Sequence, residues 1–112
     1  MNLQSNARKV RRGETGFELF KQRAREMLEL YKIYSARLVK LINRDEIQEY
    51  HYLVESFFMV WDKGIFLQYK FEHARTQFHL EEVLASTKDC IDDLFAIDCF
   101  IFRCFAAGLI SF

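Results

Sequence analysis

The chain contains no proline, and only four of its 112 residues are glycine. Tight turns between strands depend on these two residue types, because glycine reaches positive φ and proline fixes φ at the first turn position. An all-β sandwich or barrel needs many such turns. Long helices joined by short connections need few, so the composition favours an all-α fold.

Cysteine is also scarce, and its placement argues against disulfides. The three cysteines, Cys90, Cys99 and Cys104, crowd one apolar segment and show no C-x-x-C spacing. The opening residues contain no apolar run that could form the core of a secretory signal peptide. We therefore expect an intracellular protein in a reducing compartment, the cytoplasm or the nucleus, with buried thiols.

The usual marks of catalysis and of cofactor binding are missing as well. The sequence has neither a glycine-rich phosphate loop nor a nucleophile elbow. None of the three histidines follows a glutamate by three residues, which is the spacing that di-metal helical bundles use. We expect no metal, no cofactor, no small-molecule substrate and no enzymatic activity.

The apolar stretch at residues 94–112 has nearly the length needed to span a membrane. However, Asp98 and Arg103 interrupt it, and each would cost about 2.5–3.5 kcal/mol on insertion. We therefore expect no membrane partner.

Apolar residues at helical spacing are what the chain has in abundance. They make up 51% of the sequence and include twelve phenylalanines, enough for one domain with a single core. Between residues 17 and 41 the steps alternate between three and four, which is the heptad spacing of a helix with one face against a partner. These positions are Phe17, Phe20, Ala24, Met27, Tyr31, Tyr34, Leu38 and Leu41.

The sequence predicts a basic flexible arm at 1–16, followed by a four-helix bundle-like domain at 17–112. Gly64 is expected to end the second helix, and a polar join at 86–89 is expected to separate the last two. The helices are predicted at about 16–43, 46–62, 65–87 and 89–109. The apolar side of the last helix should consist of Cys90, Leu94, Ile97, Ile101 and Cys104.

An alternative fold is α+β, with a β-hairpin at about 50–72. Apolar residues alternate with other residues after Gly64, and the preceding Asp62 and Lys63 complete a suitable turn. The helical spacing of apolar residues before Trp61 is longer than this alternation and favours helices.

The formal net charge is zero, but the charge is divided unevenly along the chain. Residues 1–44 contain eleven basic and four acidic side chains, a net charge of +7, whereas residues 45–112 contain five basic and twelve acidic ones, a net charge of −7. Such a division is typical of nucleic-acid binding, of an acidic partner, or of neutralisation between packed helices.

One pair of residues has the spacing of a known motif. Arg44 and His51 are separated by six residues, which resembles the Arg-x(4–6)-His motif of the HEPN family of small helical ribonucleases. The resemblance implies a dimer that brings paired Arg44 and His51 side chains together as catalytic residues for RNA cleavage. Glu46 stands two residues after the arginine, where Asn or Asp is common in the family.

Two hypotheses about function follow. The first is a non-enzymatic protein–protein interaction or oligomerisation module, a homodimer or a subunit of a larger complex, which binds itself or another chain. Its candidate interaction residues are Arg23, Tyr31, Tyr34, Arg37 and Arg44. The alternative is a nucleic-acid-binding helical protein, with a HEPN-like ribonuclease as a sub-case. Its candidate phosphate-binding residues are Arg8, Lys9, Arg11 and Arg12 in the arm.

Overall fold

The computed structural model describes residues 14–111, and within them all regular secondary structure is helical. The all-α prediction is therefore confirmed. The alternative hairpin at about 50–72 is wrong, because those residues form one continuous helix. The described elements are α2 (Glu14–Ile42), α3 (Asp45–Gln48), α4 (His51–Glu72) and α5 (Gln77–Ala106).

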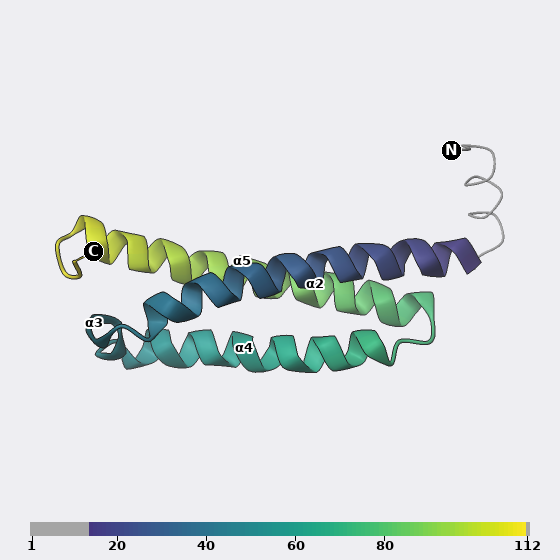
Figure 1. The fold of residues 1–112 in the computed structure, drawn as a ribbon, viewed down its shortest axis with the longest axis horizontal. Helices are drawn as coiled ribbons and strands as arrows, with labels where there is room; N and C mark the ends of the chain where they lie inside the picture. The colour runs from purple at the N-terminus through teal and green to yellow at the C-terminus, as the bar shows by residue number, and fades with distance from the viewer. Residues whose placement is uncertain (1–13, 112) are drawn as a thin grey trace.

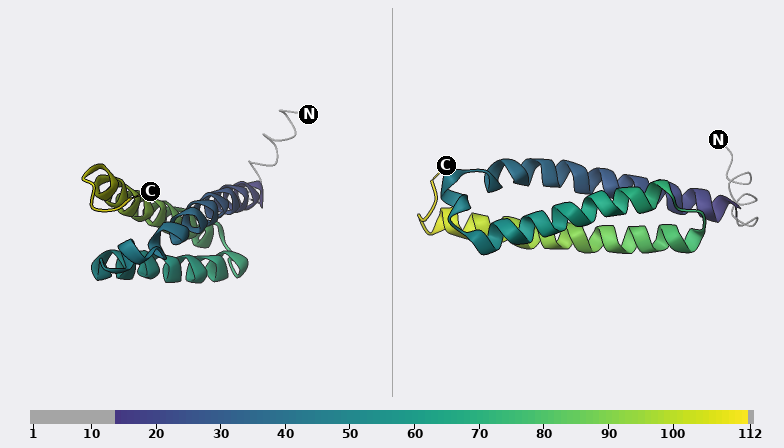
Figure 2. Two further views of the ribbon diagram at one scale, coloured as in Figure 1. Left: turned by 60° about the vertical axis from the view of Figure 1, so that its left-hand side comes forward. Right: turned by 90° about the horizontal axis from the view of Figure 1, so that it is seen from below.

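Three long helices lie side by side along the molecule, and the single turn of α3 connects the first two (Figure 1). Helices α2 and α5 run in the same direction, and α4 runs against both of them (Figure 1). The two further views in Figure 2 show that all three helices contribute to one elongated bundle. Its principal extents are 57 × 27 × 16 Å, so no helix is enclosed on all sides.

Each long helix buries one stripe of side chains whose steps alternate between three and four. This is the spacing that keeps one face of a helix against its neighbours along its whole length. In α2 the stripe is Ala24, Leu28, Tyr31, Ser35, Leu38 and Ile42. In α4 it is Leu53, Phe57, Val60, Gly64, Leu67 and Phe71. In α5 it is Leu80, Val83, Thr87, Cys90, Leu94, Ile97, Ile101 and Cys104.

The predicted apolar side of the last helix is confirmed, because all five of its residues are buried in α5. The predicted stripe of the first helix is only partly right. Ala24, Tyr31 and Leu38 are buried. The members of the predicted stripe that alternate with them are half-buried: Phe20, Met27, Tyr34 and Leu41. Leu28 takes part in the core instead, because an α-helix turns slightly less per residue than a strict heptad requires.

The predicted helix end at Gly64 is wrong. Gly64 lies in the middle of α4 and is buried against Tyr31. A Cβ atom at this position would come within 2.1 Å of the Tyr31 hydroxyl oxygen. The glycine therefore allows a large side chain to approach the backbone of α4 closely, and it does not serve as a left-handed cap.

The predicted join at 86–89 is also wrong, because these residues lie inside α5. Thr87 is buried there, and its hydroxyl donates a 2.6 Å hydrogen bond to the carbonyl oxygen of Val83 one turn earlier. The turn between α4 and α5 instead falls at residues 73–76. Thr76 is the N-cap of α5, and its hydroxyl oxygen accepts a hydrogen bond from the backbone N–H of His79 at 3.2 Å.

Candidate functional site

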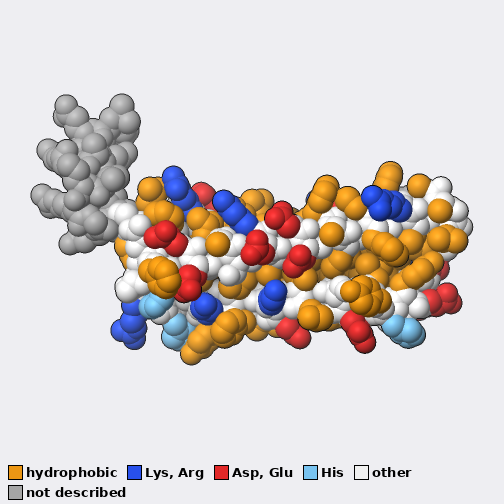
Figure 3. Space-filling model, turned by 180° about the vertical axis from the view of Figure 1, so that it is seen from behind, with side chains coloured by type: hydrophobic (Ala, Val, Ile, Leu, Met, Phe, Trp, Pro, Cys, Tyr) orange, Lys and Arg blue, Asp and Glu red, His pale blue; other side chains and the backbone are white. Residues whose placement is uncertain are grey.

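A groove of about 640 Å³ lies between α4 and α5, towards the end of the bundle that carries α3. Figure 3 shows hydrophobic side chains gathered along this seam, on the half of the molecule away from the grey N-terminal residues. The groove lining is mostly apolar and aromatic: Tyr50, His51, Tyr52, Leu53, Ser56, Met59, Val60, Lys63, Asp93, Ala96, Ile97 and Phe100.

Large apolar side chains stand exposed on both edges of this groove. On α4, Tyr52 is 85% exposed and Met59 is 68% exposed. On α5, Phe100 is 45% exposed, and its ring makes an edge-to-face contact with Tyr50 at a centroid distance of 6.3 Å. Both rings of this aromatic contact line the groove, and the exposed side chains stand along its two edges.

The seam continues beyond the apolar groove as a smaller hollow of about 230 Å³ with charged edges. Lys63 lines both hollows, and Lys70 follows it one heptad later on α4. The opposite edge, on α5, carries Asp89 and Asp93. Among residues 14–111, neither lysine forms an ion pair within 4.0 Å with these carboxylates.

The charged end of the seam lies over a buried thiol. Cys90 lines the smaller hollow, and burial raises the pKa of its thiol. A thiol in this state is protonated at neutral pH and is a poor nucleophile. Cys90 therefore acts as a small apolar core residue.

A second groove of about 570 Å³ lies between α2 and α4. Gln68 lines it, and the side-chain amide of Gln68 donates a 3.3 Å hydrogen bond to Glu72. The Oε1 atom of the same Gln68 side-chain amide is buried without a hydrogen-bond partner among the described residues. Tyr31 and Trp61 form the floor of this groove together with the buried Gly64.

The two predicted interaction tyrosines hold the bundle together. The Tyr31 hydroxyl donates a 3.0 Å hydrogen bond to the Val60 carbonyl oxygen of α4. The Tyr34 hydroxyl donates a 2.9 Å hydrogen bond to the Asp98 carboxylate of α5. Burial raises the pKa of Tyr31 to about 12, and burial together with the bond to Asp98 raises the pKa of Tyr34 to about 12.

The two predicted interaction arginines of α2 are exposed. The Arg23 guanidinium lies 5.6 Å from the centroid of the Phe20 ring of the same helix. Within the described part of the chain, neither Arg23 nor Arg37 takes part in an ion pair. Both side chains are therefore accessible to a partner, but they lie on α2 and outside the α4–α5 groove.

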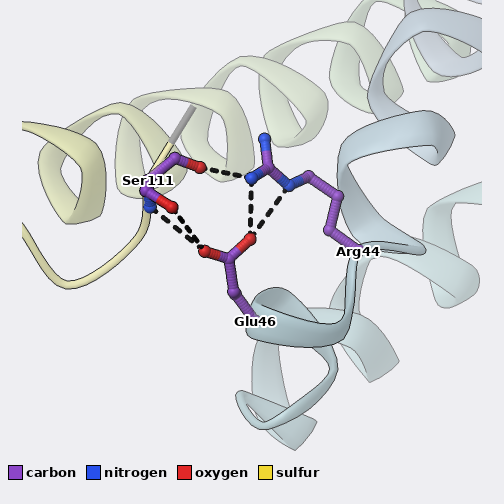
Figure 4. A network of polar contacts seen from close by, with 3 residues as sticks. All are labelled: Arg44, Glu46 and Ser111. Carbon is purple, nitrogen blue, oxygen red and sulfur yellow. Dashed lines mark hydrogen bonds and ion pairs between the residues drawn. The ribbon is translucent and has the colours of Figure 1, made fainter.

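Arg44 is tied into a network at the end of the bundle (Figure 4). Its guanidinium donates hydrogen bonds to one carboxylate oxygen of Glu46, at 2.7 and 3.2 Å, and to the carbonyl oxygen of Ser111. The Ser111 backbone N–H and hydroxyl donate to the other Glu46 oxygen at 3.2 and 3.0 Å. These bonds lower the pKa of Glu46 and fasten the segment after α5 to the start of α3.

In the structure, the two residues of the HEPN-like motif, Arg44 and His51, lie in different surroundings. Arg44 is engaged with Glu46 and Ser111, and its guanidinium also lies 5.6 Å from the Phe105 ring centroid. His51 is the first residue of α4 and lines the α4–α5 groove. No hydrogen bond joins Arg44 to His51 within the described chain.

The candidate nucleic-acid residues Arg8, Lys9, Arg11 and Arg12 lie outside the described residues. Helix α2 itself carries six basic and four acidic side chains, so its charges nearly balance. Most of the positive excess in the first part of the chain thus comes from the arm. Nucleic-acid binding stays a prediction that depends on those four residues.

Sequence reasoning missed the exposed residues of the α4–α5 seam as a group. Tyr52, Met59 and Phe66 follow one another at intervals of seven on α4, and Lys63 and Lys70 are also seven apart. Residues seven apart lie on the same helix face. The pattern could have been found only if residues 51–72 had been recognised as one helix.

Residues 14–111 contain neither a metal site nor a membrane-spanning helix. No group of three or more His, Cys, Asp and Glu side chains is arranged to hold a metal ion. None of the described helices combines the length and apolar character needed to cross a bilayer. Comparison of the chain with protein-family models, with curated proteins and with solved structures finds no match.

Proposed function

We propose that this chain is a non-enzymatic helical interaction module that binds another protein chain through the groove between α4 and α5. The observation that carries the proposal is the apolar groove itself, with Tyr52 and Met59 exposed along one edge and Phe100 along the other. Contiguous exposed apolar surface on a folded domain is typical of protein interfaces.

The kinds of residue in the groove support this proposal. Tyrosine, phenylalanine and methionine are enriched at the centres of interfaces, where large side chains fill pockets on the partner. Here they project from two long helices and not from loops, so little conformational entropy is lost when a partner binds. The floor is formed by core side chains such as Leu53 and Ile97, which hold the groove in shape.

Photo-crosslinking in the source cell tests the proposal. A photoreactive phenylalanine analogue replaces Met59 in the groove, and in a matched protein it replaces Phe102. Both positions are 68% exposed, but only Met59 lines the groove. We expect a protein adduct of defined mass from position 59 and none of that mass from position 102.

Two outcomes contradict the proposal. One is the absence of any adduct from position 59 at expression levels where the protein is folded. The other is an identical set of adducts from both positions, since this would indicate unspecific capture by exposed apolar side chains. Circular dichroism of each purified variant establishes that the helical fold is intact.

A further inference from the structure

The α4–α5 face consists of two rows of side chains that border the seam. The row on α4 contains Tyr52, Met59, Lys63, Phe66 and Lys70, and the row on α5 contains Phe100, Ala96, Asp93, Asp89 and Ser86. Because the two helices are antiparallel, both rows are apolar at the α3 end of the bundle, and their charged residues lie towards the opposite end, where Phe66 stands between the two lysines.

The charges on the two rows have opposite signs. The α4 row carries only lysines, Lys63 and Lys70, and the α5 row carries only aspartates, Asp89 and Asp93. Within residues 14–111 these lysines and aspartates form no ion pair with one another. Lys70 Nζ lies 5.6 Å from the centroid of the Phe66 ring in its own row. Since no carboxylate pairs with either lysine, the charged groups can pair with a surface that presents acidic and basic side chains in the reverse order.

A second copy of the same face provides such a surface. If a two-fold axis runs along the bundle, the α4 row of each copy meets the α5 row of the other at the same level. The turn at 73–76 and the contact of Tyr50 with Phe100 align the two helices, so Lys63 then lies level with the partner's Asp89 and Tyr52 lies level with the partner's Phe100. If the axis instead runs across the bundle, each helix meets its own copy with the ends reversed, so that the charged half of each row faces the apolar half of the partner's row.

We propose that a second copy of this chain occupies the α4–α5 face, related by a two-fold axis parallel to the bundle. The inference rests on the proposed function and identifies its partner. The apolar halves of the two faces bury each other, and the charged halves fix the direction of pairing. The alternative arrangement is disfavoured because it would bury charged side chains against apolar ones without a partner of opposite charge.

The size of the face fits a small dimer. The 22 residues of α4 give a length of about 33 Å at 1.5 Å per residue. Two helices packed 8–10 Å apart present a surface about 20 Å wide, so the projected area is roughly 660 Å². A standard stable interface buries about 800 Å² on each partner. The accessible area of a grooved surface exceeds its projection, so the face reaches this range.

Charge reversal tests the proposal by sedimentation equilibrium at tens of micromolar. One variant carries Lys63→Glu and Lys70→Glu, and a second carries Asp89→Lys and Asp93→Lys. We expect wild type at twice the chain mass of 13.5 kDa and each variant at the single mass. A 1:1 mixture of the variants, and a single chain with all four changes, should regain the doubled mass. The control, Lys40→Glu with Lys88→Glu, alters exposed lysines outside the face and should remain a dimer.

A wild-type protein of single mass overturns the second-copy inference. If position 59 meanwhile crosslinks to a protein of another mass, the proposed function stands and only the identity of the partner changes. A dimer that both reversal variants leave intact also overturns the inference, because an axis across the bundle would behave in this way. The same holds if the four-change chain stays at the single mass with its helical spectrum intact.

Discussion

Helix α2 is fastened to its neighbours by polar groups, whereas α4 and α5 face each other across an open seam. Tyr31 donates a hydrogen bond to the backbone of α4, and Tyr34 donates one to Asp98 of α5. Just after α2, Glu46 of α3 accepts a hydrogen bond from Ser111 beyond the end of α5. Across the α4–α5 seam, the described residues make no side-chain hydrogen bond or ion pair, although lysines line the α4 edge and aspartates line the α5 edge.

The difference distinguishes contacts that hold the bundle together from a surface that is open to a partner. A hydrogen bond between helices contributes about 0.5–1.5 kcal/mol and fixes their relative position, so the contacts of α2 serve the bundle itself. Exposed apolar side chains and unpaired charges contribute little to folding. On the α4–α5 seam, Tyr52, Met59 and Phe100 line one groove, which suits the binding of another chain, and this contrast can be tested by mutation.

The largest effect is expected in the hydrophobic core of the bundle. Ile101 is 1% exposed, so Ile101→Ala should lower the free energy of unfolding by roughly 2–5 kcal/mol. The neighbouring Phe102 is 68% exposed, and Phe102→Ala should cost less than about 0.5 kcal/mol. Urea denaturation of both variants measures the difference. Equal losses would show that the buried stripe of α5 is wrongly placed.

Gly64→Ala should break the tight contact between α2 and α4. The new Cβ would meet the Tyr31 ring, and such overpacking costs about 1–3 kcal/mol even though alanine is the better helix former. Thermal melting measures the loss. In a chain that also carries Tyr31→Leu the loss should be smaller than the sum of the two single losses, because the clash is removed. Strict additivity would contradict the close approach of Tyr31 to Gly64.

Alkaline pH should weaken the tyrosine contacts of α2. The pKa values of Tyr31 and Tyr34 are about 12 in the folded protein, against an ordinary value of 10.0. Between these values the unfolded chain loses protons that the folded chain keeps, so stability is complete below pH 10 and falls as the pH rises towards 12. Urea unfolding across this range should show the fall, and it should be shallower in Tyr34→Phe. An identical slope in that variant would rule out a contribution from Tyr34.

The smallest effect on folding is expected at the open seam. Met59→Ala removes a side chain that is 68% exposed, and it should change the free energy of unfolding by less than about 0.5 kcal/mol. The measurement is made at a protein concentration where sedimentation shows single chains. A loss comparable to that of a core substitution would mean that Met59 belongs to the bundle interior. The contrast between the contacts of α2 and the α4–α5 seam would then disappear.

Periodicity was sufficient to predict the fold class and the buried side of the last helix. The stripe from Cys90 to Cys104 is regular and apolar, and no competing pattern overlaps it. The helix boundaries between 62 and 89 were mispredicted because glycine and short polar residues were interpreted as breaks. Gly64 instead faces a ring from another helix, which is a contact that local sequence does not reveal.

The true turn at 73–76 contains neither glycine nor proline, so the strongest local signal for a turn is missing. Thr76 as an N-cap is the one local mark of the new helix. The groove could not be predicted without this boundary, because its two edges belong to helices whose residues were assigned to three elements. The candidate residues Tyr31 and Tyr34 were chosen from α2, and their inward bonds depend on tertiary packing.

The contact between Tyr31 and Gly64 also determines how α2 and α4 are aligned along their length. Stripes that repeat every seven residues pack almost as well after a slip of one heptad, so apolar burial alone specifies the alignment poorly. After such a slip Tyr31 would face Phe57 or Phe71, which stand seven residues before and after Gly64. A phenylalanine ring at either position would occupy the space that Gly64 leaves to the Tyr31 ring. Gly64 and Tyr31 thus favour a single register of α2 against α4.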